Sequence, residues 1–401
     1  MKEILFLSLI CFSLCSNVSR SCTTFTIKTD DELVFGRNYD FNIGYGLVFI
    51  NKKGVIKNAM TSQQPAAEWI SKYGSVTFNQ FGREFPTGGI NEAGLVVELM
   101  WLDDTKYPAK DERPAIGGVL QWIQYQLDNC ETIQEVIDTD KLIRMPTAGV
   151  PIHFLITDKY GNSAVIEFLD GKLVQHSGDD MKYKVLTNDT YDRSLNYLKS
   201  IKEFGGENEM PLVKGSLERF AQSCSMVNNY KTQPGQNAVD YGFKILDEMK
   251  QGDATKWSIV YDIKNMQIYF KTFDDQKIKN IDLASIDYNC ITPVRMLDIN
   301  AEAEGNVNEK FNEYNYAANR KLIEDSYSGV DFLKSIPDES KDRAAAYPDG
   351  LMCRSKSSIE SIDKIETDKV KSGELYYFGA LVLISTVVTG FSLKKGILKN
   401  R

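Results

Sequence analysis

From residue 22 to about residue 100, apolar and β-branched residues come in short runs separated by turn residues, a pattern that predicts β-strands. The runs lie at residues 23–28, 33–37, 47–51, 55–56 and 94–101. The first two flank Asp30 and Asp31 and therefore predict a hairpin. The last run is almost continuously apolar, which is typical of a strand buried on both faces.

Beyond residue 100 the periodicity changes to that of helices and then returns to strands. Apolar residues recur at helical spacing from Ile116, and Thr132 to Glu135 has the form of a capping box. Strand patterns lie at 152–157, 163–169, 257–262 and 266–271, and helical patterns at 194–204, 217–226 and 239–249. This order predicts an α+β fold of stacked sheets with helices on their outer faces.

The N-terminus predicts a signal peptide at residues 1–21. Its apolar run, residues 4–15, is too short to span a bilayer but has the length of a signal-peptide core. Small residues at the positions that the cleavage rule requires place the cut directly before Cys22. The alternatives are a cut after Ser16 and a lipoprotein signal, to which Ser19 is a poor match.

The C-terminus predicts a membrane anchor. Residues 375–393 are apolar, carry no charge and are long enough to cross a bilayer, and the basic residues 394–401 favour a cytoplasmic tail. The polar residues 331–374 then predict a stalk, with the folded domain at 22–330. We therefore expect a single-pass membrane protein of the secretory pathway with an extracellular or luminal domain. The alternatives are a buried helix in place of the span and an ordered helical layer in place of the stalk.

Composition excludes several kinds of site. The net charge of −8 provides no basic face for nucleic acid, and two histidines, His153 and His176, are too few for a multi-histidine zinc site. Neither a G-x-S-x-G elbow nor a phosphate- or dinucleotide-binding loop occurs. We expect no metal and no organic cofactor. Outside the signal peptide and Cys22, the pairing of four cysteines stays open: Cys130, Cys224, Cys290 and Cys353.

Cys22, once it is the first residue, offers two reactive groups. Its α-amino group and its thiol have unperturbed pKa values near 8 and 8.5, so the amine can accept the thiol proton. One residue then supplies nucleophile and general base, without a histidine. Pairing in the predicted hairpin brings Arg37 and Asp40 beside Cys22, where they can stabilise the thiolate and orient the ammonium. Taken alone, Arg37 and Asp40 would be a surface ion pair.

Several motifs together resemble the choloylglycine hydrolase and penicillin V acylase family, which are N-terminal-nucleophile hydrolases of linear amides. The resemblance covers residues 22 to 325 and rests on Cys22-Thr23-Thr24-Phe25, residues 35–41, Asn91-Glu92-Ala93-Gly94-Leu95, residues 185–188 and residues 216–220. It implies a four-layer αββα sandwich. It also implies six catalytic residues: Cys22, Arg37, Asp40, Asn91, Asn188 and Arg219.

The resemblance assigns the last three residues particular roles. Asn188 would offer its side-chain amide to the oxyanion, Asn91 would help through its backbone N–H, and Arg219 would join the charge network around the nucleophile. Without the resemblance, the two asparagines are turn residues and Arg219 is a solvated helix charge.

The predicted function is hydrolysis of linear, non-peptide amide bonds in acyl-amide or acyl-amino-acid conjugates, through a thioester on Cys22. One alternative is an amidase for N-acylethanolamine or ceramide-type lipids. Another is a catalytically silent, membrane-anchored binding protein. The expected partners are a small-molecule amide and, through the C-terminal helix, a membrane, and homo-oligomer formation stays open.

Overall fold

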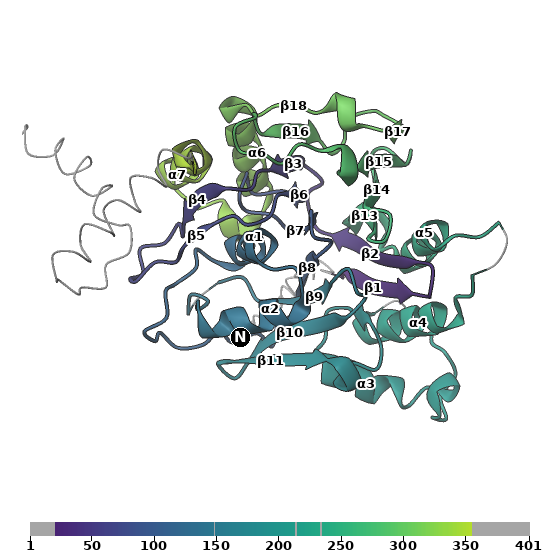
Figure 1. The fold of residues 1–401 in the computed structure, drawn as a ribbon. Coiled ribbons are helices and arrows are strands. Elements are labelled where there is room, and N and C mark those ends of the chain that lie inside the picture. Colours follow the sequence, from purple (N-terminus) through teal and green to yellow (C-terminus); the bar gives the residue numbers. More distant parts are fainter. Residues whose placement is uncertain (1–20, 148, 213–214, 233–234, 355–401) are drawn as a thin grey trace, which may run out of the picture. The chain divides into compact units, whose positions relative to one another are not determined.

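The computed structural model describes residues 21–147, 149–212, 215–232 and 235–354 of the 401-residue chain. Two large β-sheets pack against each other, and helices cover their outer faces (Figure 1). The strands are β1 (Thr23–Lys28), β2 (Leu33–Asp40), β3 (Leu47–Asn51), β4 (Val55–Asn58), β5 (Glu68–Ile70), β6 (Ser75–Asn79), β7 (Gly88–Asn91), β8 (Val96–Trp101), β9 (Ile152–Thr157), β10 (Ser163–Leu169), β11 (Lys172–Ser177), β12 (Val185–Leu186), β13 (Thr255–Asp262), β14 (Gln267–Thr272), β15 (Lys279–Asp282), β16 (Arg295–Asp298), β17 (Gly305–Asn306), β18 (Asn312–Glu313) and β19 (Met352–Cys353).

The helices lie between and after these strands. The α-helices are α1 (Val119–Asn129), α2 (Ile133–Asp138), α3 (Tyr191–Leu198), α4 (Ser216–Asn229), α5 (Ala238–Met249), α6 (Tyr316–Gly329) and α7 (Asp338–Ala346). Short 3₁₀ turns are η1 (Thr139–Lys141), η2 (Gly178–Asp180), η3 (Lys202–Phe204), η4 (Gly252–Ala254), η5 (Leu283–Ser285), η6 (Asn308–Lys310), η7 (Asp331–Leu333) and η8 (Tyr347–Gly350).

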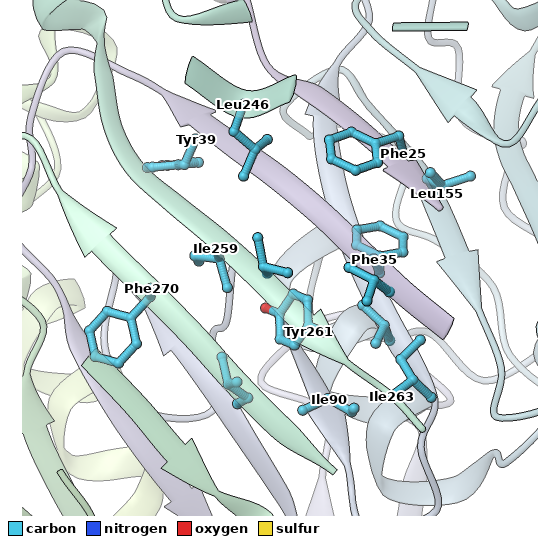
Figure 2. Packing of buried hydrophobic residues seen from close by; sticks show 14 of the residues in the cluster. Phe25, Phe35, Tyr39, Ile90, Leu155, Leu246, Ile259, Tyr261, Ile263 and Phe270 are labelled. Carbon is cyan, nitrogen blue, oxygen red and sulfur yellow. The ribbon is translucent and has the colours of Figure 1, made fainter. Parts of the chain in front are cut away.

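The first sheet has seven strands in the order β12–β1–β2–β13–β14–β15–β17, and the second has nine in the order β11–β10–β9–β8–β7–β6–β3–β16–β18. Their facing sides form one apolar core. In it the Tyr261 ring meets Phe35 and Phe78 edge to face, with ring centroids 6.0 and 6.2 Å apart. Figure 2 shows Phe35, Tyr261, Ile90 and other side chains of this cluster. Such aromatic contacts add to the stability that burial of apolar area provides.

Every residue of β2 is buried, so both faces of this strand are covered by other layers of the fold. Successive residues of a strand point to opposite faces. Arg37 points to the second sheet, where it donates to the carbonyl oxygen of Leu99, and Asn38 points to helix α5, where it donates to the carbonyl oxygen of Leu246. Gly36 has no side chain because Phe25 lies on it: a Cβ there would be 2.2 Å from the Phe25 ring. In this mixed α+β sandwich, β2 therefore lies between the second sheet on one face and helix α5 on the other.

The segment predicted as a stalk is folded in its first part. Residues 331–354 contain η7, α7 and η8, and α7 packs on α6 through Ala344 and Ala345, which meet Ile323. Small side chains let two helices approach closely, so a polar segment can dock through two alanines. The remaining stalk residues, 355–374, lie outside the described residues.

The fold class predicted from sequence is corrected in one part: the described structure contains no transmembrane helix, and the predicted span at 375–393 lies outside the described residues. The longest described helices, α4 and α6, have 14 residues each, against about 20 for a bilayer, and among described residues no helix meets the length and hydropathy needed. The predicted single-pass location and the membrane partner rested on this helix and are corrected with it. Residues 375–401 and 1–20, the latter from the predicted signal peptide, lie outside the described residues.

The four cysteines with open pairing differ in state. Cys130 and Cys224 are buried free thiols, whereas Cys290 and Cys353 are each disulfide-bonded.

Candidate active site

Cys22 lies directly before β1 and is buried, with 4% of its surface exposed. The antiparallel register of β1 and β2 sets Thr23 opposite Asn38, which brings Cys22 beside the C-terminal end of β2. There its Sγ lies 3.9 Å from the carbonyl oxygen of Asp40. The hairpin thus joins the two parts of the sequence that were expected to meet.

The Asp40 carboxyl group is buried, and only one of its two oxygens is hydrogen-bonded. Its Oδ1 accepts a 2.6 Å hydrogen bond from the Thr255 hydroxyl on β13, whereas Oδ2 is buried and has no hydrogen-bond partner in the described structure. Burial raises the pKa of Asp40 to about 6, against the hydrogen bond from Thr255 and the charges of Arg219 and Arg37. A buried carboxylate oxygen is normally hydrogen-bonded, so Oδ2 is suited to receive a cationic donor.

Arg37 lies in the buried space between the sheets and is paired with a carboxylate. Its guanidinium binds Glu98 on β8 and donates to the carbonyl oxygens of Thr87 and Leu99 at 3.1 and 3.3 Å. The other oxygen of Glu98 accepts a 2.5 Å hydrogen bond from the Tyr261 hydroxyl. Burial raises the pKa of Glu98 to about 7, and Arg37 and Tyr261 oppose this rise. The positive charge of Arg37 near Cys22 is therefore paired with the buried Glu98 carboxyl group.

Arg219 on α4 connects the nucleophile to Asn188. One of its terminal nitrogens donates to the carbonyl oxygen of Cys22 and to the Thr23 hydroxyl, both at 2.6 Å. The other donates to Asn188 Oδ1 at 3.1 Å. Because the guanidinium is planar and buried, these bonds fix the relative positions of both residues.

Asn188 follows β12, and its amide has one defined orientation. Oδ1 accepts from Arg219, so Nδ2 is the atom that donates to the carbonyl oxygen of Trp101 at 2.9 Å. An amide nitrogen carries two hydrogens, and this bond uses one of them. The second makes no hydrogen bond in the described structure.

Asn91 is not part of this cluster. Its Nδ2 donates to the carbonyl oxygens of Leu127 and Cys130 at 2.9 and 2.7 Å, and its Oδ1 accepts from the backbone of Ala93 and Leu95. Its own backbone N–H donates to the carbonyl oxygen of Leu95 at 3.0 Å. All of its donors are thus used to tie the β7–β8 turn to the end of α1, and none remains for an oxyanion.

We expect Asn91→Ala to reduce stability and to leave catalysis unchanged. The substitution removes the partners of several buried backbone groups, so the free energy of unfolding should fall by about 2–4 kcal/mol. Urea denaturation measures this loss, and kcat of the remaining folded enzyme measures the second expectation. A large loss of kcat without a loss of stability would instead place Asn91 in the catalytic machinery.

A cavity of about 200 Å³ opens beside Cys22 and Asp40. Apart from these two residues and Thr87, its wall is apolar or aromatic: Tyr39, Phe41, Phe81, Leu99, Trp101, Val119, Leu120, Val150, Ile152, Tyr327, Phe332 and Leu333. The last three belong to α6 and η7, so the folded C-terminal segment forms part of the wall. This cavity can hold an uncharged, apolar group next to the thiol.

Comparison with known proteins decides the family. The family model "Linear amide C–N hydrolases, choloylglycine hydrolase family" matches residues 22–228. The chain belongs to this family. As a linear amide hydrolase it acts on carbon–nitrogen bonds of linear amides, in agreement with the resemblance of its motifs.

Individual relatives of this linear amide hydrolase agree with the assignment. The penicillin V acylase of Pectobacterium atrosepticum is 29% identical over 327 residues, which cover 70% of this chain and 86% of the relative. A solved penicillin V acylase from Agrobacterium tumefaciens has a TM-score of 0.65 at 25% identity, and it covers 73% of this chain and 98% of its own. A conjugated bile acid hydrolase from Clostridium perfringens shares the fold, with a TM-score of 0.57 at 18% identity over 72% of this chain and 99% of its own.

The structure of this linear amide hydrolase adds site residues that sequence reasoning missed. Glu98 pairs with Arg37, Thr255 holds Asp40, and Trp101 holds Asn188. Only Glu98 had a signal, since a single acid in an otherwise apolar strand needs a buried partner. Among the described residues, no group of three or more His, Cys, Asp or Glu side chains is arranged to hold a metal ion.

Proposed function

We propose that this hydrolase works with Cys22 as its N-terminal residue, after removal of residues 1–21, and that Cys22 cleaves the amide through a thioester. The thiolate adds to the amide carbonyl carbon, the amine product leaves, and water hydrolyses the thioester. The observation that carries this proposal is the position of Cys22, at the wall of an apolar cavity and in contact with Asp40, whose Oδ2 is buried without a hydrogen-bond partner in the described structure. The start of the family match at residue 22 supports it.

The thiol needs a base close by. Burial raises the pKa of the Cys22 thiol to about 11, and the Asp40 carboxylate adds to the rise, against the charges of Arg37 and Arg219. A thiol with such a pKa is protonated near neutral pH, so a neighbouring group must remove its proton. A free α-amino group on Cys22 would do this, and as an ammonium it would give Asp40 Oδ2 the donor that it lacks.

The oxyanion of the tetrahedral intermediate needs donors that are already in place. Asn188 Nδ2 is such a donor, because Arg219 and Trp101 hold its amide from both sides. We assign no such role to Asn91. Arg219 acts here as a positioning group, since it also holds the carbonyl oxygen of Cys22. Donors that are fixed before reaction stabilise the developing charge without a cost of reorganisation.

The apolar wall supports an uncharged acyl group as the part of the substrate that enters the cavity, with the amine part leaving toward solvent. The penicillin V acylases and the conjugated bile acid hydrolase among the relatives carry names that fit two such acyl groups. We therefore propose acyl-amide or acyl-amino-acid conjugates as the substrate class.

A substrate panel tests this proposal. It contains phenoxyacetyl amides, bile-acid conjugates and fatty-acyl amides, each measured by release of the free amine. We expect hydrolysis of at least one apolar acyl amide and loss of activity after labelling of Cys22 with iodoacetamide. Activity on fatty-acyl ethanolamides alone would favour the lipid amidase, and no hydrolysis of any amide would contradict the proposal.

The pH profile should depend on Thr255. Asp40 binds the ammonium as a carboxylate, so activity falls when the pH falls through the pKa of Asp40. The Thr255 hydroxyl lowers this pKa, and Thr255→Val should therefore raise it and move the acid limb of the kcat/KM profile up by about 0.5–1 pH unit. Ser258→Ala is the matched control on the same strand, because this hydroxyl binds Asn38 Oδ1 instead. An equal shift in both variants would disprove the role of Thr255.

A further inference from the structure

A buried polar cluster lies next to Asn188, and the proposed mechanism does not use it. It contains both histidines of the chain, His153 on β9 and His176 on β11, with Glu167 on β10 close to both. The side chains of His153 and Glu167 are fully buried. A buried charged or polar cluster carries a large desolvation cost, so its hydrogen bonds decide what it can do.

His153 makes two hydrogen bonds, one to the segment that follows β12 of the first sheet and one to Glu167 within its own sheet. Its Nε2 lies 2.7 Å from the carbonyl oxygen of Thr187, and its Nδ1 lies 3.1 Å from Glu167 Oε1. A carbonyl oxygen only accepts, so Nε2 carries a hydrogen and donates. Glu167 Oε1, which also accepts from the Tyr191 N–H at 3.0 Å, contacts the ring on its opposite side. These two contacts hold the imidazole with Nε2 directed at Thr187.

The acceptor of this donor is the carbonyl group of the peptide that leads into Asn188. A peptide unit is planar, so its two polar atoms define its orientation. His153 holds the oxygen, and the Ser216 hydroxyl at the start of α4 accepts from the Asn188 N–H at 2.9 Å. The backbone of Asn188 is thus held from strand β9 on one side and from helix α4 on the other, independently of the contacts that its side chain makes.

We infer that His153, oriented by Glu167, is a positioning residue for Asn188: it fixes the Thr187–Asn188 peptide and thereby aims the Asn188 amide at the oxyanion. This inference rests on the proposed function, in which Asn188 is the oxyanion donor. Neither His153 nor Glu167 lines the cavity, so their effect on the reaction passes through Thr187. The second histidine differs, since its Nε2 lies 3.8 Å from Glu167 Oε2 and it does not contact Thr187 through any hydrogen bond in the described structure.

The kinetic test compares three variants of the full chain. His153→Leu removes the donor and should lower kcat about 10- to 100-fold, with KM and the rate of Cys22 alkylation nearly unchanged. His153→Gln should recover most of kcat, because its Nε2 takes the position of the imidazole Nε2. His176→Gln, the matched control at the other histidine, should stay within about 2-fold of the wild type. Failure of Gln to restore activity would show that His153 does not act as a donor to Thr187.

A double-mutant cycle tests whether the effect passes through Asn188. Asn188→Ala alone should lower kcat about 10²- to 10³-fold, as expected for the loss of one oxyanion donor. Adding His153→Leu to it should then lower kcat by less than about 2-fold, since the group that His153 positions is gone. If His153→Leu keeps its full effect in the absence of the Asn188 amide, the inference is wrong.

A spectroscopic readout separates this inference from the proposed function. The side-chain amide signals of Asn188, assigned by their loss in Asn188→Ala, should shift in His153→Leu and return in His153→Gln. This measurement needs no substrate. If the enzyme is active and the Asn188 signals are unchanged in His153→Leu, the inference is wrong. If the signals shift but the protein cleaves no amide, the inference is supported and the proposed function is contradicted.

Discussion

Cys22→Ala should abolish amide hydrolysis, with a fall in kcat/KM of at least about 10⁴-fold, and should leave the fold intact. The size of the effect follows from the loss of the nucleophile, because the remaining site can only bind and polarise the amide. The fold should survive because the substitution removes one sulfur atom, whose 3.9 Å contact with the carbonyl oxygen of Asp40 is weak. Amine release measures the first expectation, and thermal unfolding followed by circular dichroism measures the second.

Two further variants make this result specific. Cys22→Ser should retain only a small residual rate, because a hydroxyl is much harder to ionise than a thiol. Cys130→Ala removes another buried free thiol, which lies outside the cavity and should leave kcat within about 2-fold of the wild type. Activity of Cys22→Ala above about 1% of the wild type would mean that another group attacks the substrate.

The parts of the site that the sequence predicts well are local in the chain. The hairpin of β1 and β2 follows from two apolar runs around a short turn, and its register alone brings Cys22 to Asp40. Asn188 and Arg219 could be found only through the family resemblance, since nothing in their neighbourhood distinguishes a turn amide or a helix charge. Their roles depend on a contact across 31 positions of sequence, which periodicity does not reveal.

For Asn91 the resemblance implied a catalytic role, whereas the structure shows a structural one. Its motif is real, but the reason for it is structural: the side chain joins the β7–β8 turn to α1 with hydrogen bonds from every polar atom. Glu98, seven positions further along, was passed over because the strand was interpreted as buried on the strength of its apolar residues, and its one acid was given no role. A sequence pattern can show that a position is constrained, but the partner that causes the constraint comes from strand pairing far away in the chain.

The folded part of the predicted stalk shows that polar composition alone does not distinguish a linker from a docked helix. Residues 331–354 are polar on average, which is typical of a linker. Several of their charges are paired with α6: Lys341 with Glu324 at 3.1 Å, and Asp342 with Arg320 at 2.6 Å. Surface pairs of this kind contribute little stability each, so the alanine contacts with Ile323 remain the main reason for docking. Tyr327 of α6 packs against this alanine cluster and also lines the cavity.

Retention of a single residue before Cys22 should inactivate the enzyme almost as completely as loss of the thiol. A peptide bond converts the α-amino group to an amide, which neither accepts the thiol proton nor donates as an ammonium to Asp40 Oδ2. General-base catalysis is worth about 10²- to 10⁴-fold, so we expect a fall in kcat of about 10³-fold. Two proteins that differ by one glycine make the comparison: one begins at Cys22, and the other begins with Gly followed by Cys22.

The two proteins share the same nucleophile, cavity and donors, so a difference in rate reports on the terminal nitrogen alone. Intact mass must confirm each N-terminus, and matched unfolding temperatures must show that the added glycine leaves the fold unchanged. Addition of a small external amine should recover part of the rate in the blocked protein, because it can replace the missing base. If the blocked protein instead hydrolyses amides at more than about a tenth of the rate of the free one, Cys22 takes its base from elsewhere in the site, and Asp40, with a pKa of about 6 and one unpaired oxygen, is then the group to test.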